Sequence, residues 1–242
     1  LRPDRGFLGH KAAKLMKRAK VTEARQQAAI AEKKTLLRNV DEADGLKLHP
    51  LAWGKSGPLV RAEGLSLSYG GRTVCAGLTF TLRPGERMAV TGPNGCGKST
   101  LLKKLCGQDV AACGTLALGA GLIVSYVPQD ASFLHGGARD YARNAGVDET
   151  MFLTLLRKLG FERVQFEKDM ADYSAGQKKK VLLARSLCES AHLYLWDEPL
   201  NYIDVLSRMQ IEQLLLDYRP TMLFVEHDAA FVRRAATGTL VL

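Results

Sequence analysis

The stretch that decides the fold is "GPNGCGKST", Gly92–Thr100. It matches the spacing G-x-x-x-x-G-K-[ST], and it follows "RMAV", an apolar run with the length of a short buried strand. Glycines let such a loop wrap a phosphate with its backbone N–H groups, and the helix that follows offers the positive end of its dipole. Lys98 is expected to reach the outer phosphates of a nucleotide, and the Ser99 hydroxyl to ligate Mg²⁺. The stretch therefore predicts a nucleotide-binding loop between a strand and a helix.

Polar residues follow three further apolar runs. The run "HLYLWDE" ends in Asp197 and Glu198, "YVPQD" contains Gln129, and "FVEHD" contains His227. At a strand end, Asp197 is expected to hold Mg²⁺ through water, and Glu198 to polarise an attacking water. Gln129 is expected to reach the metal ion and the water, and His227 the γ-phosphate. Each feature alone is more often structural, but in this order, after a phosphate loop, they favour a nucleotide-hydrolysing site.

A second anion site is predicted by "YSAGQKKKVLLARSL", Tyr173–Leu187. Ser-x-Gly-Gln opens a helix, and the N-terminus of a helix attracts anions. Because the chain already has a phosphate loop for its own nucleotide, this helix start is expected to serve a nucleotide held by another domain. The pattern implies two such domains arranged head to tail, with ATP at the seams.

The pattern outside these motifs predicts an α/β fold. Residues 59–69 and 73–82 have the composition of strands separated by a turn, and the apolar runs at 121–127, 193–196 and 221–225 have strand length. Residues from about 136 to 190 look mainly helical. Strands that alternate with helices favour a core of parallel strands. We therefore expect a domain at 59–242, with a helical subdomain at about 136–190, a linker at 46–58 and a long helix at 1–45.

Charge is concentrated in the N-terminal arm. Residues 1–40 hold 11 Lys and Arg against 3 Asp and Glu, a net charge of +8, whereas residues 41–242 hold 23 against 22, a net charge of +1. Residues 10–40 contain neither Gly nor Pro and predict a helix with a thin Ala-rich seam. The asymmetry favours an acidic partner, a nucleic acid or a membrane surface, although a charge run is often only a solvated helix face. The residues expected to make this contact, with RNA if the partner is a nucleic acid, are Lys11, Lys14, Lys17, Arg18 and Lys20.

Composition excludes several classes. No apolar run approaches the roughly 18 residues of a membrane span, and no signal peptide is visible. Five cysteines without C-x-x-C spacing predict reduced thiols in the cytoplasm rather than a zinc site. The first residue is not Met, so we expect the chain to be a fragment of a longer protein.

The set of motifs resembles the ATP-binding cassette (ABC) ATPase family across residues 59–242. The resemblance implies an ABC-type P-loop ATPase domain with a mixed sheet core, an antiparallel β subdomain and a helical subdomain, preceded by a long helix. It implies that Tyr69 stacks on adenine, that Glu198, His227 and Gln129 are catalytic, and that ATP and Mg²⁺ are the cofactors. The nucleotide loop implied is Gly92, Pro93, Asn94, Gly95, Cys96, Gly97, Lys98, Ser99 and Thr100. The implied Mg²⁺ ligands are Ser99, Gln129 and Asp197, and the implied signature motif is Ser174, Ala175, Gly176 and Gln177.

Three positions depart from the family pattern. Ala175 stands where Gly is usual, and Tyr173 where Leu is usual. Leu200–Asp204 looks like the D-loop, and Tyr202 within it stands where His is frequent. Ala175 adds only a methyl group, so we expect the phosphate contact to be kept.

The arm is similar to the interdomain linker of ABC-F proteins, on "GFLGHKAAKLMKRAK" and "LKLHPL". Among these the chain looks most like bacterial antibiotic-resistance factors that protect the ribosome. The resemblance implies a translation-associated ATPase, weak as an isolated half. Its partners would be the first ATP-binding domain of the same protein (or a second copy) and the ribosome, through rRNA or tRNA, with no membrane contact. The alternatives are the ATP-binding subunit of a membrane transporter and a chromosome- or repair-type ATPase.

Overall fold

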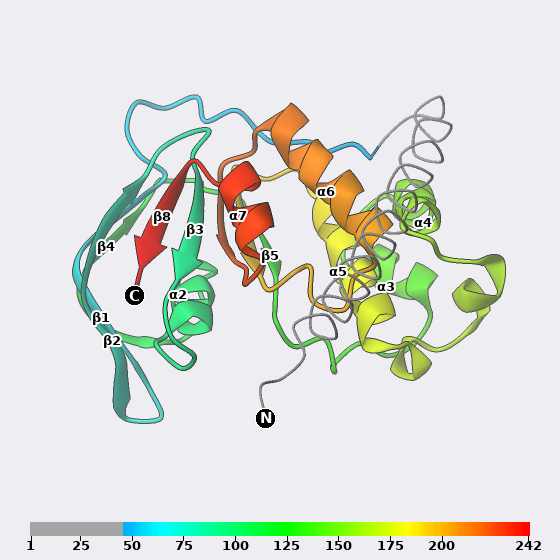
Figure 1. Cartoon of the computed structure of the whole chain (residues 1–242), viewed down its shortest axis with the longest axis horizontal. Helices are drawn as coiled ribbons and strands as arrows, with labels where there is room; N and C mark the ends of the chain where they lie inside the picture. Colours follow the sequence, from blue (N-terminus) through cyan, green and yellow to red (C-terminus); the bar gives the residue numbers. More distant parts are fainter. Residues whose placement is uncertain (1–45) are drawn as a thin grey trace, which may run out of the picture. The chain divides into compact units, whose positions relative to one another are not determined.

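The computed structural model describes residues 46–242, which form one unit. The helix predicted over residues 1–45 and its five basic residues lie outside the described residues. The α/β fold class is confirmed, with two sheets and a set of helices (Figure 1).

The core is a five-stranded sheet whose pairings are all parallel, in the order β5-β6-β7-β3-β8. The separate antiparallel β subdomain expected from the sequence is confirmed, and all pairings in the core sheet are parallel rather than mixed. Parallel strands end at the same edge, so the loops that follow β3, β5, β6 and β7 are brought together there. The strands are β3 (Arg87–Thr91), β5 (Val124–Val127), β6 (Leu193–Asp197), β7 (Met222–Val225) and β8 (Gly238–Val241).

The second sheet is antiparallel, in the order β2-β1-β4, and consists of β1 (Val60–Tyr69), β2 (Arg72–Leu82) and β4 (Ala111–Leu118). Helix α2 (Lys98–Leu105) lies between the two sheets, because its apolar residues share a buried cluster with both. Side chains along β6 alternate between faces: Leu193 and Leu195 join this cluster, while Tyr194 and Trp196 join a second cluster among the helices.

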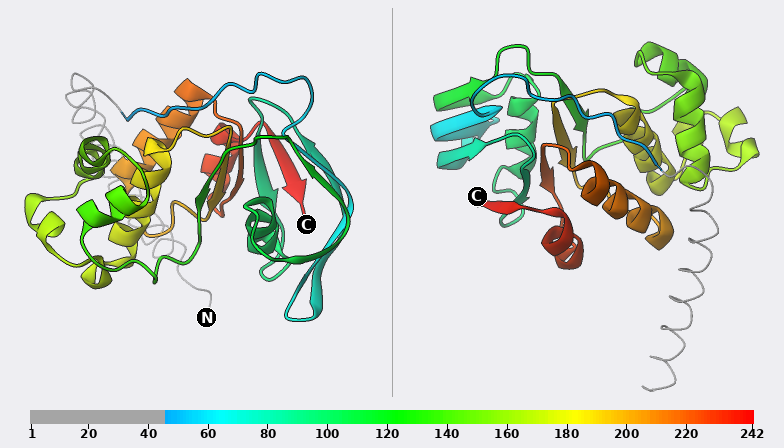
Figure 2. Two further views of the ribbon diagram at one scale, coloured as in Figure 1. Left: turned by 180° about the vertical axis from the view of Figure 1, so that it is seen from behind. Right: turned by 90° about the horizontal axis from the view of Figure 1, so that it is seen from above.

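The remaining helices lie on the other face of the core sheet. The views in Figures 1 and 2 place the antiparallel sheet and helices α3–α5 at opposite ends of the unit. Side-chain caps fix several helix starts, since Asp148, Asp204 and Asp228 each accept a backbone N–H within the first turn. The helices are α3 (Ala138–Asn144), α4 (Glu149–Lys158), α5 (Ala175–Cys188), α6 (Val205–Tyr218) and α7 (Ala229–Ala235), with short 3₁₀ turns η1 (Arg163–Glu167) and η2 (Met170–Asp172).

Residues 46–58, which the sequence analysis assigns to a linker, contain no helix or strand and pack on the domain. Leu48 is 2% exposed, and the Leu51 N–H donates to the Ala191 carbonyl at 2.8 Å. The Trp53 ring meets His192 edge to face, with 5.3 Å between the ring centroids. This segment is therefore tied to the start of β6.

Candidate nucleotide site

The phosphate loop lies between β3 and α2 and needs its glycines. Gly92 has a φ of 146° and Gly97 a φ of 100°, a region that L-residues with side chains rarely enter. A Cβ at Gly92 would stand 2.7 Å from the Leu242 carbonyl oxygen, so the loop also needs Gly for space. Gly97 caps α2 without a side-chain hydrogen bond, which leaves the first backbone N–H groups of the helix available to an anion.

Lys98 is held across the loop. Its Nζ donates to the carbonyl oxygens of Gly92 and Pro93, both at 2.9 Å, and the residue is only 8% exposed. The ammonium is therefore positioned at the loop before any ligand arrives, which lowers the ordering cost of binding a phosphate.

Asp197, at the end of β6, is fully buried, and neither of its carboxylate oxygens has a hydrogen-bond partner among residues 46–242. Burial raises the pKa of this carboxyl, while the nearby Ser99 hydroxyl acts in the opposite direction. An unpartnered carboxylate beside a hydroxyl suits a hard cation such as Mg²⁺, whose remaining ligands are water and phosphate oxygens. Within the described residues no group of three or more His, Cys, Asp or Glu could hold a metal by itself.

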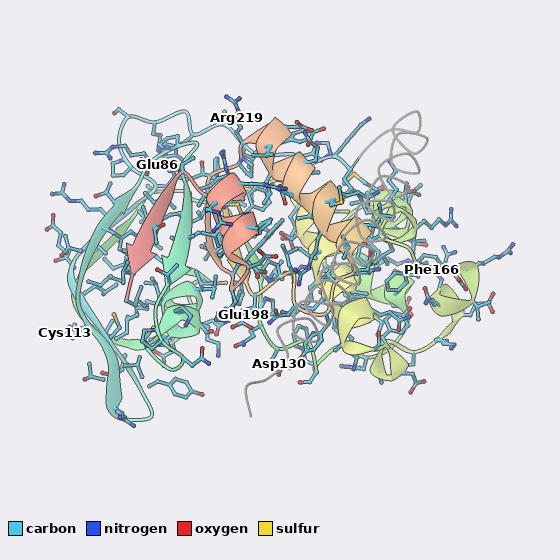
Figure 3. All side chains as sticks on the ribbon, in the orientation of Figure 1. Glu86, Cys113, Asp130, Phe166, Glu198 and Arg219 are labelled. Atoms are coloured by element: carbon cyan, nitrogen blue, oxygen red, sulfur yellow. The ribbon has the colours of Figure 1, made fainter. Side chains whose placement is uncertain are left out.

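Glu198 and His227 meet at the mouth of the site. The Glu198 Oε1 and His227 Nε2 atoms are 3.1 Å apart, and the Asn201 side-chain amide donates to Glu198 Oε2 at 2.6 Å. Glu198 has a φ of 49°, an uncommon left-handed conformation, and its N–H donates to the Val225 carbonyl. Its side chain is 13% exposed against 54% for His227. Figure 3 labels Glu198 near the centre of the unit.

A pocket of about 480 Å³ brings most of the predicted nucleotide residues together. Tyr69 is 66% exposed at its rim, with the Lys103 ammonium 6.0 Å from the ring centroid, so a base has an open aromatic face. Gly92, Pro93 and Cys96 belong to the loop without lining the pocket. The predicted residues that line it are Tyr69, Asn94, Gly95, Gly97, Lys98, Ser99, Thr100, Gln129, Glu198 and His227.

The predicted signature motif does not line this pocket. The Ser174 hydroxyl accepts the Gln177 N–H at 3.3 Å, and the Gln177 side chain accepts the Ser174 N–H at 2.9 Å, which starts α5 with a reciprocal cap. A Cβ at Gly176 would lie 2.4 Å from the Tyr202 carbonyl oxygen, so this helix start packs closely on the loop after β6. Tyr173 is buried, and its hydroxyl donates to the Gln165 carbonyl. The motif thus belongs to a different surface from the pocket.

The sequence analysis missed two buried charges beside the site. Glu226, before His227 in "FVEHD", accepts the N–H of Leu200 at 2.8 Å, and burial raises the pKa of its carboxyl. Lys179, within a run of three lysines, is 4% exposed, and burial lowers the pKa of its ammonium. The only sequence signal for Glu226 was an acid directly after an apolar run. Lys179 gave none.

A phosphate loop after one strand of a parallel sheet, a buried acid at the end of another strand and a set of helices between them define a class of P-loop nucleotide-binding domains. The family model described as ABC transporter matches residues 75–201, and the chain belongs to this family. Domains of this family bind ATP, normally with Mg²⁺, hydrolyse it, and work with a partner domain or as dimers. A solved structure titled "Structure of ATP binding subunit of ABC transporter" matches the fold with a TM-score of 0.62 at 24% identity, covering 76% of this chain and 85% of that chain.

Curated relatives fall into two groups. ATP-binding protein Uup of Caulobacter vibrioides is 32% identical, over 78% of this chain and 33% of its own length. Ribosome protection protein VmlR of Bacillus subtilis is 30% identical, over 76% of this chain and 34% of its own length. This chain thus spans about a third of these proteins. Zinc import ATP-binding protein ZnuC of Ruegeria pomeroyi is 34% identical, over 76% of this chain and 75% of its own length. In residues 46–242, no helix combines the length and apolarity that crossing a bilayer requires.

Proposed function

We propose that Gly92–Thr100 and Tyr69 bind the nucleotide, that Ser99, Asp197 and Gln129 serve Mg²⁺, and that Glu198 acts on the attacking water. The observation that carries this proposal is the contact between Glu198 and His227, 3.1 Å apart in a pocket that the phosphate loop also lines. A carboxylate there can accept a proton from water, and the His227 ring can hold the carboxylate in place and reach the γ-phosphate. When bound, Mg²⁺ would neutralise the phosphate oxygens.

The test replaces Glu198 with Gln, which keeps the shape and the bond from Asn201 but cannot take a proton. MgATP binding is expected to stay within about threefold of the parent, while hydrolysis falls by a factor of about 10² to 10⁴, the usual contribution of general base catalysis. Hydrolysis at the parent rate would remove Glu198 from this role. The matched control is Glu212→Gln, a carboxylate on α6 that pairs with Arg234 outside the pocket.

The signature motif is proposed to face the nucleotide of a second domain. It lies outside the pocket of its own chain, on a helix start suited to an anion. A single chain at high dilution is therefore expected to bind MgATP and hydrolyse it poorly, with a rate that rises faster than linearly with protein concentration. A brisk rate independent of concentration would contradict this arrangement.

For the whole protein, we propose an ABC-F protein that binds the bacterial ribosome in the cytoplasm and protects it from antibiotics, with this chain as its linker helix and second ATP-binding domain. Support comes from Uup and VmlR, of which the chain spans 33% and 34%, and from the net charge of +8 in residues 1–40, which suits RNA phosphates. The first ATP-binding domain of the same protein would complete the pair.

The test of ribosome binding uses the arm. Changing Lys11, Lys14, Lys17, Arg18 and Lys20 to Gln keeps helix propensity and removes five charges. Ribosome affinity across a salt series is expected to fall and to lose up to about one unit of log–log slope for each lost phosphate contact, with ATP binding unchanged. Unchanged affinity and slope would leave the arm as a solvated helix. The control variant removes the same number of exposed charges from the ATPase domain: Arg72, Arg83, Arg139, Arg163 and Lys168.

The alternative is the ATP-binding subunit of a membrane transporter. The observation in its favour is the match to ZnuC, three quarters of whose length this chain covers at 34% identity. The same ribosome assay separates the two functions, because a transporter subunit should show no salt-dependent ribosome binding through residues 11–20.

A further inference from the structure

The lysine run Lys178–Lys180 near the start of α5 contains one member whose burial the proposed chemistry does not use. Lys179 is 4% exposed, Lys178 is half-buried, and the Lys180 side chain is 14% exposed and paired with Asp204. The Lys179 Nζ donates to the Pro128 carbonyl at 2.9 Å and to the Asp197 carbonyl at 3.3 Å. One ammonium thus joins the helix that opens with the signature motif to two strand ends of the core sheet.

The two acceptors directly precede the residues that the proposed chemistry depends on. Gln129 follows Pro128, and Glu198 follows Asp197, so each carbonyl belongs to the peptide unit that carries the next residue. Gln129 and Glu198 line the nucleotide pocket, and Lys179 does not. The two hydrogen bonds of Lys179 therefore act on the backbone that holds those two side chains.

Desolvation by burial lowers the pKa of the Lys179 ammonium, and the neighbouring carboxylates of Asp197, Glu198, Glu226 and Asp130 offset only part of this effect. An apolar side chain of the same length would fill this space without the desolvation cost. What the ammonium adds is directional hydrogen bonding to two carbonyls at once.

We propose that Lys179 is a positioning residue for ATP hydrolysis, whose ammonium fixes the Pro128 and Asp197 backbone and thereby sets the Gln129 and Glu198 side chains against the γ-phosphate. This inference rests on the proposed roles of those two residues. Lys179 is also in the second turn of the helix that opens at Ser174, so a shift of that helix start reaches both strand ends through one side chain.

The experiment compares Lys179→Met, Lys179→Arg and Lys104→Met with the parent 242-residue chain, measuring kcat and KM for MgATP at one fixed, high protein concentration. Lys104 is a matched control, since its Nζ donates to the Val110 carbonyl at 2.7 Å, away from Gln129 and Glu198. The Met variant at Lys179 should lose about 10- to 100-fold in kcat with KM within about threefold, because small misplacements of reacting groups cost this much. The Arg variant should recover to within about threefold of the parent, because a guanidinium keeps N–H donors for both carbonyls and the adjoining pocket of about 330 Å³ can take its extra bulk.

The outcomes separate this inference from the proposed function. A kcat like that of the parent in Lys179→Met would overturn it. So would a fall in kcat together with a rise in KM that the Arg variant does not restore. If the Met variant fails to fold, Lys179→Gln replaces it, and its kcat and KM are interpreted in the same way. Should Glu198→Gln hydrolyse ATP normally, the proposed function fails. Should Glu198→Gln be inactive while Lys179→Met keeps its kcat, only the positioning role fails.

Discussion

Replacing Asp197 with Asn is expected to stabilise the domain while weakening its use of Mg²⁺. The carboxylate is fully buried, and neither oxygen has a hydrogen-bond partner within residues 46–242. A buried polar group left unsatisfied costs about 1–3 kcal/mol, and a charged one costs more. Asn has nearly the same shape without the charge. Lys179 loses a neighbouring negative charge but keeps both of its carbonyl acceptors, so the offset is partial.

A net gain of about 2 kcal/mol in the free energy of unfolding follows, which for a domain of this size raises Tm by about 4–8 °C. The assay is thermal unfolding in EDTA, in Mg²⁺ alone, in ATP with EDTA and in MgATP. In EDTA the Asn variant should melt above the parent. MgATP at 100 times its Kd should stabilise the parent by about 2.7 kcal/mol. The difference between the stabilisation by MgATP and that by ATP with EDTA should disappear in the variant.

The control is Asp109→Asn, an exposed carboxylate whose replacement should leave every Tm unchanged. The reasoning is refuted if the Asp197 variant melts at or below the parent in EDTA, because the buried charge would then be compensated in the folded domain. It is refuted equally if the variant keeps the full Mg²⁺-dependent rise in Tm.

Three further changes test the geometry around the site. Gly92→Ala should cost about 1–3 kcal/mol of unfolding free energy in a denaturant titration, because Ala must adopt a φ of 146° beside a carbonyl oxygen; an unchanged midpoint would contradict the clash. Gly176→Ala should lower the free energy of unfolding by a similar amount, because its methyl group would clash with the Tyr202 carbonyl oxygen, and it should also lower ATPase activity. An unchanged free energy of unfolding would contradict this. Although burial acts to raise it, the Lys180 ammonium and the Ser207 bonds lower the pKa of Asp204 to about 2. Asp204→Asn should therefore cost about 0.5–1 kcal/mol at pH 7, as for a half-exposed pair. This difference should be complete above the ordinary aspartate pKa and shrink as pH falls toward about 2, and a pH-independent difference would exclude the charge as its source.

The core of the fold was predictable because its strands are nearly uniform apolar runs. All five residues of β6 are buried, and so are all four of β7, which makes both recognisable as continuous apolar segments. Two strands were missed, β4 and β8, and both are edge strands. In β4 only Leu116 is even half-buried, so its sequence carries no alternation of apolar and polar residues to detect.

The convergence of the site residues was predictable for a topological reason. Gln129, Asp197, Glu198 and His227 each follow an apolar run, and parallel strands bring such positions to one edge whatever the order of the strands. The contacts between them were not predictable. The hydrogen bonds that the Asn201 amide donates to Glu198 and that the Leu200 N–H donates to Glu226 depend on the path of a loop. That loop includes two non-glycine residues at positive φ, Glu198 and Tyr202.

Lys179 shows most clearly what a pattern of residue types leaves out. Three consecutive lysines predict a solvated helix face, yet successive residues of a helix point about 100° apart, so one of three must turn away from its neighbours. Which one turns inward depends on how α5 is rotated about its axis, and its buried apolar residues, among them Val181, Leu182 and Leu187, set that rotation. A rotation by one residue would point Lys178 or Lys180 inward and leave the Pro128 and Asp197 carbonyls without their shared donor. The apolar face that packs α5 into the core thus also determines which lysine reaches this chain's own site.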